Sequence, residues 1–220
     1  MHTGIRVLTC VLLALGSAQA QGTITGTVVD ETGKPLAGAK VHIAERDRVV
    51  GHRLIQYYET DDNGRFRIPH VPWGTYVLMA GKERAGYPDL VFNFYNDLAL
   101  PTATLAEAFP SADVMVKVGP KAGVLELEPV TDAATGKEIP LASVTLRRAD
   151  NPDLSISGSA SQRRIFVPSL TRIVAEIMAE GYKSWPPSGA EADGTLFLRP
   201  EEIRKLRVAL QPNEPTSGAK

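Results

Sequence analysis

Residues 22–41 read GTITGTVVDETGKPLAGAKV, and this stretch carries the clearest indication of the fold. Ile24, Gly26 and Val28 alternate with polar residues, as one face of a β-strand does. The alternation stops over residues 30–35, where Asp, Gly and Pro are typical of a turn, and then resumes. The stretch therefore predicts a strand, a turn and a second strand.

The same pattern continues downstream. Residues 61–64 read DDNG, a turn sequence, and the alternation that follows places Phe66 and Ile68 on a buried face. Another alternating stretch covers residues 76–80. No long amphipathic helix is indicated, so the first hundred residues predict short strands joined by turns.

The second half of the chain repeats this plan. TGKPLA at residues 32–37 recurs as TGK at 135–137 and PLA at 140–142, with two residues inserted between them. Residues 69–80 align without a gap onto residues 168–179. The chain is therefore interpreted as two copies of one unit.

This alignment makes a prediction about burial. It matches Val41 with Leu146 and Leu78 with Ile177. Each half also closes with an alternating strand, which matches Val116 with Val208. Because every one of these residues lies on the apolar face of its strand, we expect each pair to be buried at corresponding positions.

Two halves of about 95 residues, each with some seven short strands, suit two tandem Greek-key β-sandwich modules with antiparallel sheets. The predicted fold class is all-β. The predicted boundaries are a signal peptide at 1–20, a first sandwich at 21–119, a second, diverged sandwich at 120–212 and a disordered tail at 213–220.

The N-terminus has the features of a secretory signal. Arg6 precedes an apolar run over residues 7–15, and Ala18, Gln19 and Ala20 form a small-x-small cleavage site. The run is too short to span a bilayer. We expect export to the periplasm, the cell surface or the medium, and no transmembrane segment in the mature chain.

Composition excludes several classes of function. Cys10 is the only cysteine and lies inside the apolar run, so the mature chain has no disulfide. The formal net charge is −1, which does not favour nucleic acid as a partner. An exported chain without disulfides must be held together by its hydrophobic cores.

The first half resembles a known family in the order and spacing of its motifs. These are the opening strand, the Gly-Lys-Pro-Leu-Ala-Gly turn, the Thr-Asp-Asp-Asn-Gly-Arg-Phe turn and Val-Pro-Trp-Gly-Thr-Tyr, at residues 22–29, 33–41, 60–66 and 71–76. Residues 22–82 resemble the carboxypeptidase regulatory-like domain family. The resemblance implies a small transthyretin-like (prealbumin-like) sandwich, usually without a catalytic role of its own.

The second half departs from the pattern of that family. Arg172 and Ile173 stand where the first half has Trp73 and Gly74, and Ser-Gln-Arg replaces the Asp-Asn-Gly turn. We therefore interpret it as a diverged copy.

His42 and Glu45 spell HxxE, the spacing with which a zinc carboxypeptidase holds its metal. On a strand, residues three apart point to opposite faces, so these two side chains cannot hold one ion. We expect His42 to face solvent, opposite the buried Val41 and Ile43. Asp61 and its neighbours could offer oxygens to calcium, but a hairpin turn is the favoured interpretation and no metal site is predicted.

Enzymatic activity is not expected. His42, His52 and His70 raise the comparison with the transthyretin-like hydrolases of 5-hydroxyisourate, but the Tyr-Arg-Gly-Ser segment that ends that family is absent. Loose histidines are not a positioned catalytic constellation. We predict no catalytic residue and no cofactor.

Aromatic side chains are the feature that could recognise a ligand. Four candidates are Tyr57, Tyr58, Trp73 and Trp185. Aromatic rings suit the apolar faces of sugars, although rings in the core or capping the end of a sandwich explain the same residues.

The sequence thus predicts an exported, non-enzymatic structural or interaction protein. Its partner would be another envelope or extracellular protein, or a polysaccharide. The alternative is a carbohydrate-binding protein that uses exposed aromatic side chains.

Overall fold

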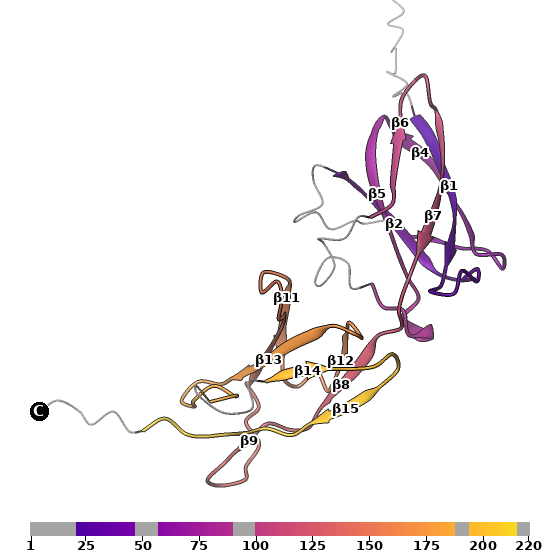
Figure 1. The fold of residues 1–220 in the computed structure, drawn as a ribbon. Helices are drawn as coiled ribbons and strands as arrows, with labels where there is room; N and C mark the ends of the chain where they lie inside the picture. The colour runs from indigo at the N-terminus through magenta and orange to yellow at the C-terminus, as the bar shows by residue number, and fades with distance from the viewer. Residues whose placement is uncertain (1–20, 47–56, 90–99, 188–193, 215–220) are drawn as a thin grey trace, which may run out of the picture.

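The computed structural model describes residues 21–46, 57–89, 100–187 and 194–214. In this part of the chain the protein is all-β, as the sequence predicts, apart from the short 3₁₀ helix η2 (Glu83–Ala85) (Figure 1). The predicted signal peptide and most of the predicted tail lie outside the described residues.

The first module has seven strands in its described residues. They are β1 (Gln21–Val29), β2 (Lys40–Glu45), β3 (Tyr58–Glu59), β4 (Arg65–Pro72), β5 (Gly74–Gly81), β6 (Thr102–Leu105) and β7 (Ser111–Lys117). They form two sheets, with strand orders β4-β1-β7 and β3-β2-β5-β6.

The two sheets enclose one hydrophobic core. Ile24 and Ile68 contribute from the three-stranded sheet, and Val41, Leu78 and Leu105 from the four-stranded sheet. Buried residues alternate with partly buried ones along β1 and mostly with exposed ones along β4, so the period-two pattern of the sequence is the pattern of burial.

Gly26 is required by the tight approach of three strands. A Cβ atom at this position would lie 1.9 Å from the carbonyl oxygen of Val114 on β7 and 2.6 Å from the ring of Phe66 on β4. A side chain here would force the neighbouring strands apart.

The second module consists of β8 (Gly123–Leu127), β9 (Thr131–Asp132), β10 (Ser143–Arg148), β11 (Ser155–Ser159), β12 (Arg164–Val167), β13 (Arg172–Met178), β14 (Thr195–Phe197), β15 (Ile203–Leu206) and β16 (Ala209–Leu210). Its main sheets have the orders β12-β8-β15 and β11-β10-β13-β14. The short parallel pair β9 and β16 follows β8 and β15 along the chain, after Pro129, which cannot donate to a ladder.

The two modules therefore share one topology. Strand for strand, β4-β1-β7 corresponds to β12-β8-β15, and β3-β2-β5-β6 corresponds to β11-β10-β13-β14. The second half of the chain is a structural copy of the first, although the residues at many positions differ.

Backbone hydrogen bonds give the correspondence of residues between β2 and β10. The carbonyls of Ala39 and Ala142 each accept a bond from the residue that follows the third strand of the module, at 3.0 and 2.8 Å. Val41 therefore corresponds to Val144, two residues before the Leu146 that the sequence alignment gives. Both are buried, because a shift of two residues keeps a side chain on the same face.

The same shift occurs in β13. Leu78 and Ala175 each donate a backbone N–H to the residue that precedes the next strand, β6 or β14. Leu78 thus corresponds to Ala175 rather than Ile177, because the turn into β13 is shorter. All three side chains are fully buried. The predicted face of the strand was therefore right, and the predicted register was wrong by two residues, which is one period of the strand.

The sheets are not wholly antiparallel, which corrects the sequence-based expectation. β1 pairs with β7 in parallel, and β8 pairs with β15 in parallel. A module whose first and last strands run in the same direction begins at one end and ends at the other. The modules consequently follow one another end to end along the chain (Figure 1).

Each module has its own main core. The core of the first is drawn from residues 24–118 and that of the second from residues 125–210. All three predicted pairs are buried, including Val116 and Val208. The domain boundary near residue 119 itself stays a prediction.

Candidate functional site

The outer face of the β3-β2-β5-β6 sheet is covered in the first module. Ala44, Val77 and Met79 point away from the main core and form a second small apolar cluster with Leu100. β5 is consequently buried on both faces over most of its length. Leu100, which lies just before β6, packs on this face.

His42 lies on the same covered face and is only 2% exposed, so the expectation that it faces solvent is wrong. Its Nε2 lies 3.2 Å from an Asp89 carboxylate oxygen, and the Tyr57 ring meets its ring edge-on at 5.2 Å between centroids. Burial lowers the pKa of His42, and the neighbouring charge of Asp89 opposes that effect. Alternation correctly predicted that His42 points away from the main core but could not show that the opposite face is also covered.

A cleft of about 790 Å³ opens beside this histidine. Its described lining combines an aromatic ring with three cationic and three acidic side chains, over a floor that includes two glycines: Gly38, Lys40, Tyr57, Glu59, Gly81, Lys82, Glu83, Arg84 and Asp89.

Strand pairing positions one wall of the cleft. Lys40 on β2 lies directly opposite Glu59 on β3, and its Nζ lies 5.9 Å from the centroid of the Tyr57 ring. On the other wall, Lys82 Nζ donates to the carbonyl of Ala37 at 2.6 Å. These contacts hold donors, acceptors and a ring in fixed places around one space.

The four aromatic candidates from the sequence do not share one surface. Tyr57 is 57% exposed and lines the cleft. Tyr58 and Trp73 pack against the first core, and Trp185 packs against the second. The four rings therefore do not form a flat platform. One of them, Tyr57, is exposed inside a charged cleft.

The equivalent surface of the second module is built differently. Thr145 and Ser157 take the places of His42 and Tyr57, and their hydroxyl oxygens are 2.9 Å apart. Nearby, Arg147 and Glu176 form an ion pair at 2.8 Å. Side chains on this face of the second module bond one another, and Thr145 and Ser157 bring no aromatic ring to it.

No metal centre is seen in the described part of the chain, where no three His, Cys, Asp or Glu side chains gather closely enough to share an ion. Asp61 accepts backbone bonds from Asn63 and Arg65 at 2.9 and 2.8 Å, and Gly64 has a φ of +71°. The residues considered for calcium thus form the predicted hairpin turn.

A second recurring feature was not found from the sequence. Tyr87 donates its hydroxyl to Glu31 at 2.7 Å, and Tyr182 donates to Asp132 at 2.9 Å. Both tyrosines follow a glycine of positive φ. Glu31 lies in the turn after β1, and Asp132 is the last residue of β9, where the corresponding turn begins. The repeated Gly-Tyr pair was the signal that could have found this tie. Burial and the neighbouring Glu31 raise the pKa of Tyr87.

The turn that contains Gly86 and Tyr87 also contacts the second module. The carbonyl of Gly86 accepts a bond from Ala122 N at 2.8 Å, across the predicted boundary. Lys121 Nζ bonds Glu201 at 2.6 Å, and its own carbonyl accepts from Ser169 at 2.7 Å. The hydrogen bond to Glu201 raises the pKa of Lys121, and the negative charges of Glu31 and Asp30 in the first module raise it further.

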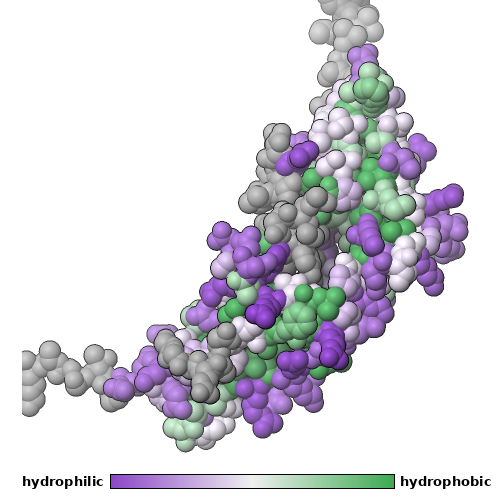
Figure 2. Space-filling view, in the orientation of Figure 1, coloured by the Kyte–Doolittle hydropathy of each residue, from purple (hydrophilic) through white to green (hydrophobic). Residues whose placement is uncertain are grey.

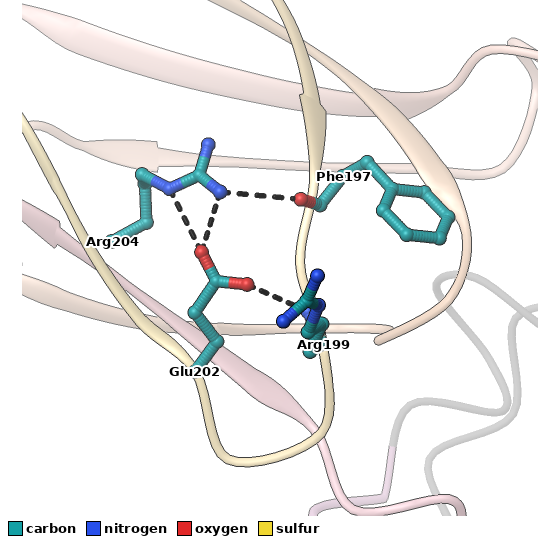
Figure 3. A network of polar contacts seen from close by, with 4 residues as sticks. All are labelled: Phe197, Arg199, Glu202 and Arg204. Atoms are coloured by element: carbon teal, nitrogen blue, oxygen red, sulfur yellow. Dashed lines mark hydrogen bonds and ion pairs between the residues drawn. The ribbon is translucent and has the colours of Figure 1, made fainter.

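The turn that supplies Glu201 is itself tied down (Figure 3). One Glu202 carboxylate oxygen accepts from Arg204, and the other accepts from the backbone N–H of Arg199 at 2.9 Å. Arg204 also reaches the carbonyl of Phe197 at 3.4 Å. The bond to Arg199, followed by Arg204, lowers the pKa of Glu202. These bonds brace the β14–β15 turn that meets the junction.

The remaining surface is mixed. In Figure 2 hydrophilic residues surround separate apolar patches on both modules. Large exposed apolar side chains include Phe109, Met115 and Leu141, which come from different turns and strands. Single exposed residues of this kind are ordinary and indicate no site. Among the described residues, no helix is long and apolar enough to cross a membrane.

Comparison with known families agrees with the sequence analysis for the first half. Residues 23–96 match the carboxypeptidase regulatory-like domain, so the predicted resemblance is confirmed there, and no family model was matched to the second half. A search of the curated proteins returned no match.

Solved structures with some similarity include a protein of Bacillus anthracis and two pilins. The Bacillus anthracis TIE protein is 16% identical, with a TM-score of 0.36, over 88% of this chain and 34% of that one. A streptococcal ancillary pilin is 13% identical, with a TM-score of 0.35, over 90% and 64%. The shaft pilin SpaA of Lactobacillus rhamnosus GG is 13% identical, with a TM-score of 0.31, over 88% and 98%. This chain thus spans about a third and just under two thirds of the first two, and TM-scores this low say nothing about function.

Proposed function

We propose that this protein is an exported, non-enzymatic interaction protein whose two sandwiches form one fixed unit that presents the cleft of the first module. The carrying observation is the junction, where Ala122 donates its backbone N–H to the carbonyl of Gly86 in the first module. On the side of the second module, Glu201 bonds both the carbonyl of Ala122 and the side chain of Lys121.

Two features support a fixed unit rather than beads on a flexible linker. The parallel pairing of β1 and β7 places the exit of the first module at the end opposite its start. The exit then passes directly into β8, with Ala122 buried and bonded on both sides, to Gly86 and to Glu201. A backbone bonded in this way on both sides loses most of its freedom to rotate.

The non-enzymatic part of the proposal rests on the cleft. The histidine beside the cleft, His42, does not line it: its Nε2 lies 3.2 Å from a carboxylate oxygen of Asp89, and its side chain is almost fully buried. A general base must reach the proton that it removes, and this one is covered. The partner would be an envelope or extracellular protein, or a polysaccharide.

The relative orientation of the modules tests this proposal. Residual dipolar couplings of the chain from Gln21 onward are expected to fit one alignment tensor for both modules. Lys121→Glu sets a fourth acidic side chain beside Asp30, Glu31 and Glu201, so it should give the two modules separate tensors. Lys117→Glu, on the exposed face of β7, is the matched control and should behave like the wild type. Independent tumbling of the wild-type modules would contradict a fixed unit.

Export is tested separately. The full chain, expressed in a bacterium with a general secretory pathway, should be recovered outside the cytoplasm. Its measured mass should be that of the chain whose N-terminal residue is Gln21. Retention in the cytoplasm at full length would contradict export and would leave the orientation measurement unaffected.

A further inference from the structure

The cleft of the first module has a lining that points to a particular class of ligand. In the part of the lining that the structure describes, three cations, Lys40, Lys82 and Arg84, are matched by three carboxylates. These described side chains carry no net charge with which to attract an ion, so they favour neither a polyanion nor a polycation. The volume, about 790 Å³, is that of a site for a small or medium-sized molecule.

Donors and acceptors lie side by side in this cleft. Lys40 and Glu59 are direct cross-strand neighbours. Around the position of Gly38, a Cβ atom would lie 3.4 Å from Glu59 Oε1 and 3.8 Å from Lys82 Nζ, so a carboxylate and an ammonium converge over a glycine floor. A hydroxyl group both donates and accepts, and it can therefore bridge such a pair.

Tyr57 adds the apolar element. Its ring is more than half exposed, and contact with His42 and Lys40 holds it in place. Aromatic faces pack well against the C–H surfaces of ring-shaped polar molecules. An extended peptide would instead need a row of free backbone groups, and β3, the strand beside the cleft, is only two residues long.

We propose that this cleft binds a neutral oligosaccharide, with Tyr57 against the face of one sugar ring and the Lys40, Glu59 and Lys82 group bonded to its hydroxyls. The inference rests on the proposed function, because it names the ligand class of the surface that the fixed unit presents. It also explains the difference between the modules, since Ser157 in the second module has no ring to offer at the place of Tyr57.

The test uses the chain from Gln21 onward and a panel of neutral hexasaccharides: α-1,4-, β-1,4- and β-1,3-linked glucans and β-1,4-linked N-acetylglucosamine. At least one is expected to shift the amide resonances of Lys40, Tyr57 and Glu59, with a Kd on the order of 0.1–1 mM. Tyr57→Ala should weaken that binding at least tenfold. Phe109→Ala removes an equally exposed ring from the β6–β7 turn and should leave it unchanged.

Two further arms separate the alternatives. A neutral ligand should bind equally well in about 50 mM and about 500 mM NaCl, whereas a charged one loses affinity. Tighter binding of an acidic hexasaccharide, such as oligogalacturonate, or of a mixed-charge peptide would overturn the proposal. It is also overturned if no panel member shifts the cleft resonances, or if Tyr57→Ala binds like the wild type. Any of these results leaves the orientation test of the proposed function standing.

Discussion

The two four-stranded sheets share a strand order but not an outer face. In the first module Ala44, Val77 and Met79 on that face are covered and apolar. In the second, Arg147 and Glu176 stand where Ala44 and Met79 do, and they pair with each other. The same strand order thus carries an apolar outer face that is covered in the first module and a charged outer face in the second. The two faces differ in the residues at alternate positions of β2 and β10 and of β5 and β13.

The sharpest way to break this comparison is to place the same charge on both faces. Val77 and Val174 are equivalent valines, buried in the first module and only partly buried in the second. Val77→Asp should lower the free energy of unfolding of the first module by about 3 kcal/mol or more, because it buries an uncompensated carboxylate. Val174→Asp places its carboxylate opposite Arg147, and the cost should stay within about 0.5 kcal/mol.

Unfolding of each module can be followed on its own, because the chain has two tryptophans and the structure places one in each module. Fluorescence in urea would be recorded on Trp185→Phe and Trp73→Phe backgrounds. Equal destabilisation by the two aspartates would show that the outer faces are alike and that the description of a covered face is wrong.

A medium effect is expected from the tyrosine tie. Tyr87→Phe removes a hydrogen bond to a carboxylate from a buried hydroxyl, and should destabilise the first module by about 1.5 kcal/mol. Tyr182→Phe removes the more exposed tie of the second module and should cost less. The comparison is sharpened if the order holds in urea unfolding. A larger cost at Tyr182 would show that the two ties are not equivalent.

The smallest effect is a dependence on pH that only the first module should show. Burial holds the pKa of His42 below its ordinary 6.5, so the folded module prefers the neutral imidazole. As the pH falls below about 6.5, the unfolded chain takes up a proton that the folded module resists, and stability is lost. Melting of the first module should fall slightly between about pH 7 and pH 5.

The second module supplies the control for that measurement, because it has Thr145 at the equivalent position. His42→Thr should remove the difference between pH 7 and pH 5 in the first module. A melting temperature that rises as the pH falls would mean that Asp89 outweighs burial and raises the His42 pKa above its ordinary value.

The strands and the repeat could be predicted from the sequence because alternation survives an error in register. Matching Val41 with Leu146 was wrong by two residues, yet the prediction that Leu146 is buried was right. Alternation repeats every two residues, so it identifies faces well and positions along a strand poorly. The error in β10 comes from the two residues that the sequence alignment inserts between Lys137 and Pro140, because the backbone bonds show no insertion there. The error in β13 comes from the shorter turn before that strand, which the gapless alignment of residues 69–80 misses.

The cleft could not be predicted in the same way. Tyr57 was a candidate because of its residue type, but Lys40 lies on β2 whereas Lys82 and Asp89 follow β5, and only the fold brings these segments together. His42 was misjudged because the chain that covers its face follows β5, far from it in sequence. Trp73 and Trp185 were candidates for the same reason as Tyr57, and they lie against the cores.

The central claim is that two equivalent sandwiches follow one another along the chain. Its most direct test is to truncate one side chain in the core of the first module and to measure the melting of both modules. Leu78 is fully buried in the first module, and Leu78→Ala should cost that module about 2–5 kcal/mol. In calorimetry, with the tryptophan backgrounds to assign each transition, the melting of the first module should fall while that of the second stays nearly unchanged, since few bonds cross the junction. One cooperative transition that Leu78→Ala shifts as a whole would contradict the account and show a single domain.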